Sequence, residues 1–350
     1  MRKLDQNLKV SVVIPCRNEI MYIARVLESI LDQNYPKEQM EVIVVDGMSI
    51  DGTVDILKEY QNKYSFIKYL ENEMQVTPNA MNIGIRNATG DVVVRMDAHS
   101  IYPKNYISRL VEWLIWLDAD NVGGSLITKP ARDTLEAKAI AHAMSHPFGV
   151  GNAYFRLGVN NPKQVDTVPF GCYWRKVFDK IGLYDEDLVR GQDNELNSRL
   201  EQKGGKIFLV PDIKTEYFPR DTLKKAWKMY FQYGYCRPFV NQKLGRPATI
   251  RQFVPMLFIL STAFFLLLST YNIFFLYIAL LELGLYFFIA LMVSSKISFS
   301  KKNLSLIPTL IITFLGIHFS YGLGYLKGLF ETFALGRSPN VTMKDTPLTR

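Results

Sequence analysis

Residues 92–99 read Val-Val-Val-Arg-Met-Asp-Ala-His, so three β-branched residues run almost directly into an acid and a histidine. A short continuous apolar run of this kind predicts a strand that is buried on both faces. If the backbone stays extended, Asp97 and His99 project to the same side, because alternate side chains of a strand share a face. A carboxylate and an imidazole placed in this way can bind one divalent cation, Mn²⁺ or Mg²⁺. The alternative is that Asp97 caps the next turn and His99 is an ordinary loop histidine.

The chain around this stretch alternates between β-rich runs and apolar residues at helical spacing. The β-rich runs occupy residues 10–15, 42–45, 67–70 and 92–94. The helical patterns occupy residues 23–31, a segment that ends near residue 64, and residues 79–87. This alternation predicts an α/β fold in which a mostly parallel, Rossmann-like sheet carries helices on both faces.

Polar residues follow the predicted strands at the point where each strand ends. Arg17 and Glu19 follow the first strand, Asp46 follows the second, and Asp97 with His99 follows the fourth. Because ligands of open α/β sheets bind at the carboxyl ends of strands, we expect these groups to converge on one edge. The first strand precedes neither GxGxxG nor GxxxxGK[ST], which argues against ordinary dinucleotide binding and P-loop chemistry. An acid for a ribose or base, beside a cation for a diphosphate, is the combination that a nucleotide-sugar site needs.

Several ordered motifs between residues 10 and 217 resemble those of the family 2 glycosyltransferases, which have the GT-A fold. The matching segments are Val-Val-Ile-Pro-Cys-Arg-Asn-Glu at 12–19, Val-Val-Asp at 44–46, Ser-Ile-Asp-Gly-Thr at 49–53, Asn-Ile-Gly-Ile at 82–85, Ala-Thr-Gly-Asp at 88–91 and Asp-Ala-His at 97–99. Further matches are Gly-Cys-Tyr-Trp-Arg at 171–175, Ile-Gly-Leu-Tyr-Asp-Glu at 181–186 and Gly-Gln-Asp-Asn-Glu-Leu at 191–196.

This resemblance implies roles for individual residues. The nucleotide-sugar pocket would be formed by Pro15, Arg17, Glu19, Asp46, Asn82 and Asp97. Asp97 and His99, at the family's Asp-x-Asp position, would hold the divalent cation on the donor diphosphate. Asp193 would be the general base, and the acceptor side would include Gly171, Arg175 and Asn194. The resemblance also implies that transfer inverts the anomeric configuration.

The residues around Asp193 give a separate reason to consider it catalytic. A carboxylate beside an acceptor hydroxyl can remove the hydroxyl proton as the new bond forms. Asp193 stands early in a predicted helix with Glu195 nearby, and a like charge there is expected to raise the pKa of Asp193. The alternative is that Asp193 is a helix-start acid favoured by the helix macrodipole.

The sequence departs from the family pattern at three places. The segment Asp46-Gly47-Met48-Ser49 replaces the usual Asp-Asp-Gly-Ser, which removes one carboxylate from the pocket. The segment Ala80-Met81-Asn82 replaces the frequent Ala-Arg-Asn, which removes a positively charged side chain that could contact the diphosphate. His99 replaces the second metal carboxylate, so metal affinity is expected to fall more steeply with acid. The Asp-x-His pattern is similar to that of bacterial exopolysaccharide glucosyltransferases of the succinoglycan type. The Gln-x-x-Arg-Trp motif of processive synthases is absent, which favours transfer of a single sugar.

The net charge of +8 is concentrated in one short region. Residues 220–252 contain eight Lys or Arg residues and one acid, Asp221, with aromatic residues interleaved. A basic stretch commonly indicates nucleic-acid binding. Its position directly before an apolar segment favours an anionic membrane surface instead, with no nucleic acid as partner. The segment is expected to lie on the lipid headgroups, and an amphipathic helix packed on the catalytic domain is a compatible alternative.

Three apolar runs follow the basic region, at residues 253–269, 271–293 and 304–326. A membrane-spanning helix needs about 20 apolar residues, so the second and third runs qualify and the first is marginal. Lys296, Lys301 and Lys302 favour a cytosolic loop after the second run. A third span would place Lys327 and Arg337 outside, against the same rule, so the choice between two and three spans stays open.

The family resemblance, together with the apolar runs, implies a membrane-anchored enzyme that moves one sugar from a nucleotide sugar, expected to be UDP-linked, to a lipid-linked saccharide in exopolysaccharide or cell-envelope glycan synthesis. The predicted division is 1–220 catalytic, 221–252 interfacial, 253–326 membrane and 327–350 polar tail. The polar residues 1–9 resemble no signal peptide, so the catalytic domain is expected on the cytosolic side of the cytoplasmic membrane. Polysaccharide-assembly proteins are expected as further partners. The alternatives are transfer to polyprenyl phosphate, a processive synthase, and a non-catalytic nucleotide-sugar sensor or scaffold.

Overall fold

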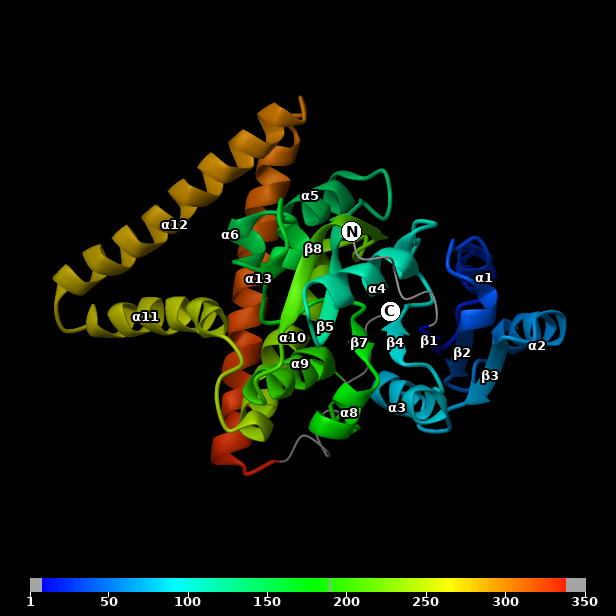
Figure 1. The fold of residues 1–350 in the computed structure, drawn as a ribbon. Coiled ribbons are helices and arrows are strands. Elements are labelled where there is room, and N and C mark those ends of the chain that lie inside the picture. The colour runs from blue at the N-terminus through cyan, green and yellow to red at the C-terminus, as the bar shows by residue number, and fades with distance from the viewer. Residues whose placement is uncertain (1–7, 189, 338–350) are drawn as a thin grey trace. The chain divides into compact units, whose positions relative to one another are not determined.

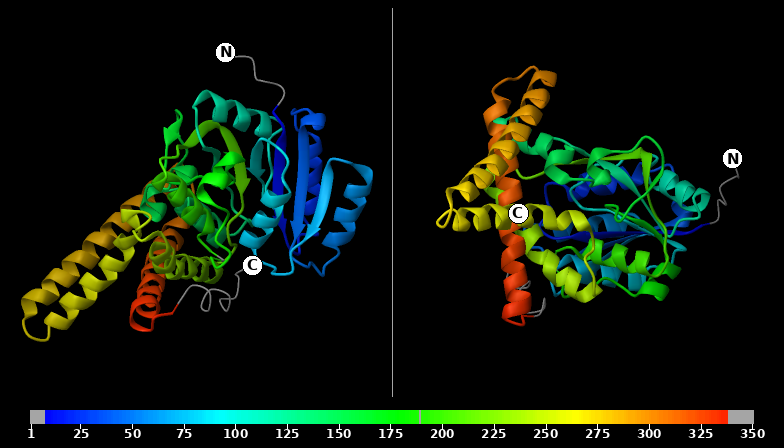
Figure 2. Two further views of the ribbon diagram at one scale, coloured as in Figure 1. Left: turned by 60° about the horizontal axis from the view of Figure 1, so that its bottom comes forward. Right: turned by 90° about the vertical axis from the view of Figure 1, so that its left-hand side faces the viewer.

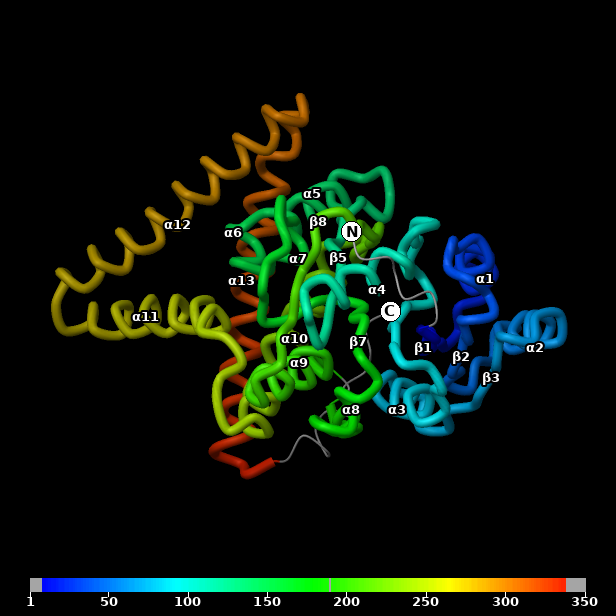
Figure 3. The backbone as a smooth tube through the Cα atoms, viewed as in Figure 1, coloured from blue at the N-terminus to red at the C-terminus, as the bar shows by residue number. Residues whose placement is uncertain are grey.

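The computed structural model describes residues 8–188 and 190–337. The chain forms two compact units. Unit 1 comprises Met1–Ile127 with Gly158–Tyr217, and unit 2 comprises Thr128–Leu157 with Phe218–Arg350. The chain thus leaves unit 1, contributes a segment of short helices to unit 2 and returns, a path that Figure 3 traces. The functional division at residues 220, 252 and 326 is a separate question and stays a prediction.

Unit 1 is built on a sheet with eight strands in the described part of the chain, in the order β3-β2-β1-β4-β7-β5-β8-β6. The strands are β1 (Val10–Cys16), β2 (Met40–Asp46), β3 (Ile67–Glu71), β4 (Val92–Arg95), β5 (Asn121–Thr128), β6 (Lys163–Gln164), β7 (Cys172–Trp174) and β8 (Ile207–Tyr217). β3, β2, β1 and β4 pair in parallel, whereas β7 is antiparallel to both β4 and β5. The predicted parallel sheet is confirmed for its first half, and the second half is mixed. Antiparallel neighbours need no crossover helix, which is why the second half lacks regular β-α alternation.

Helices cover both faces of this sheet (Figures 1 and 2). They are α1 (Ile23–Leu31), α2 (Thr53–Lys63), α3 (Thr77–Asn87), α4 (Tyr106–Trp116), α8 (Lys176–Ile181) and α9 (Gln192–Gln202), with a 3-10 turn η1 (Lys37–Gln39). α3 packs directly on β1, because a Cβ atom on Gly84 would lie 2.3 Å from Cγ1 of Val13. Strands covered on both sides carry apolar residues at successive positions, and residues 42–45 of β2 are accordingly all buried.

Unit 2 is built from helices. They are α5 (Leu135–Ala143), α6 (Pro147–Val150), α7 (Tyr154–Leu157), α10 (Leu223–Leu244), α11 (Val254–Leu268), α12 (Ile273–Ser300) and α13 (Leu306–Leu329), with a 3-10 turn η2 (Ile250–Phe253) and a π-helical turn η3 (Phe330–Ala334). In the described residues, three segments are long and apolar enough to cross a membrane: Ile250–Leu268, Ile273–Ser300 and Leu306–Ala334. The predicted C-terminal apolar helices are therefore confirmed.

α10 carries most of the basic residues of the predicted interfacial segment, and it packs closely on α13. A Cβ atom on Gly324 would lie 2.1 Å from the carbonyl oxygen of Phe231, and one on Gly234 would lie 2.0 Å from that of Tyr321. Helix backbones approach this closely only where small residues stand at the contact. α10 is therefore a packed helix, and its partner within unit 2 is α13.

Candidate functional site

The carboxyl ends of β1 and β2 are locked together by the turn that follows β2. The fully buried carboxylate of Asp46 accepts hydrogen bonds from the backbone N–H of Ser49 at 2.8 Å and from the Ser49 hydroxyl at 2.5 Å. The same hydroxyl accepts a hydrogen bond from the backbone N–H of Asn18 at 2.6 Å. Asp46 therefore fixes the position of the loop after β1.

Pro15 and Arg17 lie beside Asp46 at these strand ends. Pro15 pairs with Val45 in the parallel register of β1 and β2. The Arg17 side chain lies against Gly47, where an added Cβ atom would be 3.3 Å from its methylene carbons. Three residues that the resemblance assigns to the nucleotide pocket thus meet at one edge of the sheet.

Arg95, the last residue of β4, joins the two carboxylates that were predicted to serve metal binding and base catalysis. Its Nε and Nη2 lie 3.1 Å from one oxygen of Asp97, and its Nη1 pairs with Asp193 in the first turn of α9. The side chains of Arg95 and Asp97 are 8% and 17% exposed, whereas that of Asp193 is 33% exposed. Asp193 is therefore the most solvent-exposed member of the cluster, as a group that meets an acceptor must be.

Burial and charge together set the protonation of this cluster. Burial lowers the pKa of Arg95, but the charges of Asp193 and Asp97 outweigh it and raise that pKa well above its ordinary value. Burial raises the pKa of Asp193, the Arg95 charge opposes the rise, and Asp97 adds to it. Because its pKa is raised, Asp193 is a stronger base than an ordinary aspartate.

The predicted direction of this pKa shift agrees with the structure, but the predicted cause is wrong. Burial is the main cause and Asp97 is the like charge that adds to it, whereas both carboxylate oxygens of Glu195 accept hydrogen bonds from Arg199, each at 2.7 Å. Arg199 also donates to the carbonyl oxygen of Leu183 at 2.8 Å, which ties α9 to the preceding loop. Residues 193 and 195 stand only two positions apart in the helix, so their side chains lie on different faces.

His99 faces Glu19 across the loops that follow β4 and β1. Nδ1 of His99 lies 3.3 Å from Oε1 of Glu19, whose side chain is only 3% exposed. Within residues 8–188 and 190–337, no group of three or more His, Cys, Asp or Glu side chains is placed to hold a metal ion. A cation on Asp97 and His99 would take further ligands from a bound molecule, and phosphate oxygens commonly supply them.

The Asn82 side chain, which the resemblance assigns to the nucleotide-sugar pocket, forms hydrogen bonds to the loop before α9. Its side-chain NH₂ donates to the carbonyl oxygen of Tyr184 at 2.9 Å and to Glu186 at 2.7 Å, and its amide oxygen accepts from the Tyr184 N–H at 2.9 Å. Asn82 therefore ties α3 to the loop before α9, and its contacts support a positioning role.

Two of the three predicted acceptor-side residues lie beside the cluster. The Gly171 carbonyl accepts a hydrogen bond from the backbone N–H of Arg95 at 3.0 Å. Asn194 follows the candidate base in the first turn of α9. Arg175 is not brought there, because its Nε donates to the carbonyl oxygen of Gly90 at 2.9 Å, at the amino end of β4.

Arg95 and Tyr184 are site residues that the sequence analysis missed. Arg95 stands in an otherwise apolar strand, two positions before Asp97, so the two side chains share a face. A charge in a buried strand requires a partner, which is a signal that could have found it. Tyr184, in the segment 181–186, has a buried side chain near enough to Asp193 to lower the pKa of that carboxyl. The proximity of Tyr184 to Asp193 could not be predicted from local sequence, because the two residues lie in different segments of the chain.

Comparisons with known proteins identify the family to which the chain belongs. Residues 11–182 match the family described as Glycosyl transferase family 2. The chain is 32% identical over 244 residues, covering 67% of this chain and 74% of the relative, to the dolichyl N-acetyl-α-D-glucosaminyl phosphate 3-β-D-2,3-diacetamido-2,3-dideoxy-β-D-glucuronosyltransferase of Methanococcus voltae. It is 29% identical over 247 residues, covering 70% of this chain and 74% of the relative, to the succinoglycan biosynthesis protein ExoA of Rhizobium meliloti.

A solved structure is similar over most of the chain. It is a mannosyltransferase from Pyrobaculum calidifontis, determined in complex with GDP-Man and Mn²⁺. The TM-score is 0.56 at 18% sequence identity, covering 93% of this chain and 88% of that one, which supports the GT-A fold. The motifs, the sheet and the relatives lead to one conclusion: the chain belongs to the family 2 glycosyltransferases.

Proposed function

We propose that this glycosyltransferase moves a single sugar, with inversion, from a UDP-linked nucleotide sugar to a lipid-linked saccharide. The observation that carries the proposal is the Arg95 bridge, which holds Asp97 and Asp193 at the same end of the sheet. Displacement at an anomeric carbon builds negative charge on the leaving diphosphate and releases a proton from the acceptor hydroxyl. A metal ligand and a base at one strand end meet these two needs.

Asp97 and His99 would hold Mn²⁺ or Mg²⁺ at this strand end. Their carboxylate oxygen and imidazole nitrogen fit such a cation. Since Nδ1 of His99 is turned to Glu19, Nε2 is the nitrogen that would meet the metal. A carboxylate on the far nitrogen is a common support for a metal-binding histidine. When bound, the cation supplies charge stabilisation for the departing diphosphate. The Mn²⁺ in the similar mannosyltransferase supports this assignment.

Asp193 would accept the proton of the acceptor hydroxyl, since it is the solvent-facing carboxylate of the cluster and its pKa is raised. Arg95 would be a positioning residue that holds Asp193 and keeps it ionised. Pro15, Arg17 and Asp46 would line the nucleotide side of the pocket. Gly171 and Asn194 would stand on the acceptor side.

The acceptor class rests on the relatives and on unit 2. One relative is named for a dolichyl-linked glucosaminyl phosphate and another for succinoglycan biosynthesis. Such an acceptor cannot leave the bilayer, and the apolar helices of unit 2 would hold the enzyme beside it. We place the catalytic unit at the cytosolic leaflet of the cytoplasmic membrane, in exopolysaccharide or cell-envelope glycan synthesis. The first relative favours a lipid-linked saccharide over bare polyprenyl phosphate.

The test is release of nucleoside diphosphate by the detergent-purified full chain. A panel of nucleotide sugars is supplied with total membrane lipid, with Mn²⁺ or with chelator. We expect turnover of one UDP-sugar that requires both lipid and metal. For an Asp193→Asn variant, Asp118→Asn is the matched control. Asp118 is a 93% exposed carboxylate of the same unit, and it pairs with Lys206.

Other outcomes would revise the proposal in different ways. Turnover without metal would show that Asp97 and His99 are misassigned. Turnover with purified polyprenyl phosphate, and none with glycosylated lipid, would select the other acceptor class. Nucleotide binding without turnover on any sugar would favour a sensor.

A further inference from the structure

The three apolar helices of unit 2 differ in what surrounds them. In the most apolar windows of the first two candidate spans, 11% of residues are buried, against 33% in the third, which contains α13. α11 and α12 expose large apolar side chains along their length, including Leu267, Leu281 and Phe288 at 65%, 72% and 59%. α13 is instead covered in part by other elements of unit 2. The first two helices are therefore suited to lipid, and α13 needs a separate account.

The first half of α13 packs against the segment that leaves unit 1. The rings of Phe148 and Phe314 have centroids 5.0 Å apart, and His318 forms a hydrogen bond of 2.8 Å between its Nε2 and the Phe148 carbonyl oxygen. A Cβ atom on Gly149 would lie 3.2 Å from the Phe314 ring. This half of α13 is thus covered by α6 and the adjoining α5, which carries Lys138.

From its middle onward, α13 packs against α10, which is rich in lysine. A Cβ atom on Gly316 would lie 1.7 Å from Nε1 of Trp227, so the Trp227 side chain of α10 lies directly against α13 at Gly316. Lys224, Lys225 and Lys228 surround Trp227 in sequence, and all three are exposed. The contact between α10 and α13 therefore places the turn of α10 that carries these three lysines at the level of the middle of α13.

An upright orientation of α13 conflicts with these neighbours. The 24 residues of α13 extend for about 36 Å, and Gly316 lies about 15 Å from the start of the helix. The hydrocarbon core of a bilayer is about 30 Å thick, so a spanning α13 would hold Gly316 near its centre. The lysines beside Trp227 would then lie at the most costly depth for a charge, too far from either surface to snorkel out.

We propose that α13 lies along the membrane surface and that only α11 and α12 enter the bilayer. The partner of α13 and α10 is then an anionic lipid surface. Ile312 and Leu323 are 45% and 48% exposed, and their helical spacing places them on one side of α13. Phe330 and Phe333, 60% and 74% exposed, continue this apolar surface in the π-helical turn η3. This apolar stripe would rest in the headgroup boundary, and the lysines of α10 would contact lipid phosphates.

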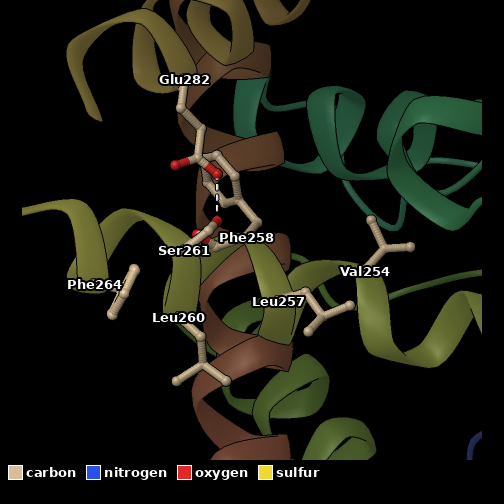
Figure 4. Close-up of a pocket in the computed structure, with 7 residues that line it drawn as sticks. All are labelled: Val254, Leu257, Phe258, Leu260, Ser261, Phe264 and Glu282. Atoms are coloured by element: carbon tan, nitrogen blue, oxygen red, sulfur yellow. Dashed lines mark hydrogen bonds between the residues drawn. The ribbon is translucent and has the colours of Figure 1, made fainter. Parts of the chain in front are cut away.

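The hairpin of α11 and α12 is built to enter the bilayer without α13. The turn between α11 and α12 projects away from α13 (Figures 1 and 2). The two helices are held to α13 by the rings of Phe258 and Phe319 and by a hydrogen bond of 2.7 Å between the Tyr286 hydroxyl and Nδ1 of His318. Glu282, an acid in the middle of α12, accepts hydrogen bonds from Ser261 at 2.5 Å and from Thr262 at 3.1 Å, both on α11. Figure 4 shows Glu282 turned toward Ser261, beside an otherwise apolar pocket. The acid is thus satisfied inside the hairpin, as an acid in hydrocarbon must be.

This arrangement also resolves the charge conflict of a third span. With α11 and α12 entering and leaving the bilayer as one hairpin, the loop that contains Lys301 and Lys302 and the residues after α13 lie on the same side of the membrane. Lys327 and Arg337 then share the side of the other basic residues, as the positive-inside rule requires.

Spin-label depth measurements on the full chain test the proposal. Single cysteines replace Leu323, Phe330 and, as the hairpin reference, Leu281, and each is labelled with a nitroxide. The native cysteines are all buried, so the unsubstituted chain provides the background. The protein is reconstituted into vesicles of phosphatidylcholine with a minor share of phosphatidylglycerol. We expect equal, shallow depths at 323 and 330 and a deep label at 281. Seven residues correspond to about 10 Å along a helix, so a spanning α13 would separate the depths at 323 and 330 by that amount.

A second measurement is independent of depth. Lys302→Cys and Leu335→Cys are treated with a membrane-impermeant maleimide in sealed vesicles of one orientation. We expect both positions to react from the same side. Labelling from opposite sides, unequal depths at 323 and 330, or a shallow label at 281 would each overturn the proposal. None of these readouts depends on the donor, the acceptor or catalysis, so the result stands apart from the proposed function.

Discussion

Each end of the unit 1 sheet holds a carboxylate with a shifted pKa, but the two shifts are in opposite directions. At the amino end, Glu41 of β2 accepts hydrogen bonds from the Ser11 hydroxyl at 2.6 Å and from the Thr89 N–H at 2.6 Å, and Lys68 pairs with it at 3.2 Å. Burial alone would raise its pKa, yet these partners outweigh burial and lower the pKa to about 2. At the carboxyl end, burial prevails and raises the pKa of Asp193.

Glu41 and Asp193 differ in the number of hydrogen-bond donors that surround each carboxylate. Glu41 receives donors from three strands or strand-edge loops, so its charge is fully compensated and serves stability. Asp193 depends mainly on Arg95, which it shares with Asp97. A carboxylate with few donors and a solvent-facing side is poised to take a proton, whereas one enclosed by donors is not. The comparison predicts that substitutions at the carboxyl end change catalysis, and that substitutions at the amino end change stability.

Asp193→Asn should have the largest effect. The amide cannot accept the acceptor proton, so we expect turnover to fall on the order of 10²–10⁴-fold, the usual contribution of a general base. Binding of the nucleotide sugar, measured by calorimetry, should be retained because Asp193 does not line the nucleotide side. Near-normal turnover would mean that another group is the base and that the two sheet ends do not differ as argued.

Arg95→Gln should have the next largest effect. Loss of the bridge would misplace Asp193 and lower turnover on the order of 10–100-fold. Because the Arg95 charge holds the pKa of Asp193 down, its removal should raise that pKa and move the acid limb of the kcat/KM profile to higher pH. Arg95→Lys keeps the charge and should keep the limb near its original position. An unmoved limb in both variants would assign Arg95 a purely structural role.

The sequence predicted the parallel half of the sheet because its strands are β-rich runs that are separated by apolar residues at helical spacing. It did not predict the antiparallel half, since β7 and β6 are only three and two residues long and carry no periodicity. The excursion of residues 128–157 into unit 2 was also missed, because nothing in its composition differs from an ordinary helical connection.

The candidate site was also predicted only in part from the sequence. Asp97, His99 and Asp193 were found from motifs, yet Arg95, which joins two of them, pairs with a residue 98 positions away. Local patterns report burial and secondary structure, but ion pairs between distant segments depend on how strands are ordered in the sheet. Glu41 was overlooked for this reason as well, because its partners lie in three other segments of the chain.

Glu41→Gln tests the stability side of the comparison. A pKa lowered from 4.5 to about 2 corresponds to roughly 3 kcal/mol of folding stability at neutral pH. Because the pKa is lowered on folding, this stabilisation is complete above about pH 5 and is lost as the pH falls toward 2. Thermal unfolding of the detergent-solubilised chain should show a deficit in the variant at pH 7 that narrows with acid. Turnover per folded molecule should not change, and a loss of turnover would contradict the division between the two ends.

Arg175→Lys should have the smallest effect, and it probes a residue that the family resemblance places on the acceptor side. Its guanidinium donates to the Gly90 carbonyl beside the Glu41 network, and its backbone N–H donates to the Asp91 carbonyl at 2.8 Å. Both bonds hold the amino end of β4, so the variant should lose about 1 kcal/mol of stability, the value of one hydrogen bond. The KM for the lipid acceptor should be unchanged, since the residue lies at the opposite end of the strand from Asp97. A raised acceptor KM with normal stability would mean that the acceptor reaches the amino end of the sheet, and the two ends would then share the catalytic task.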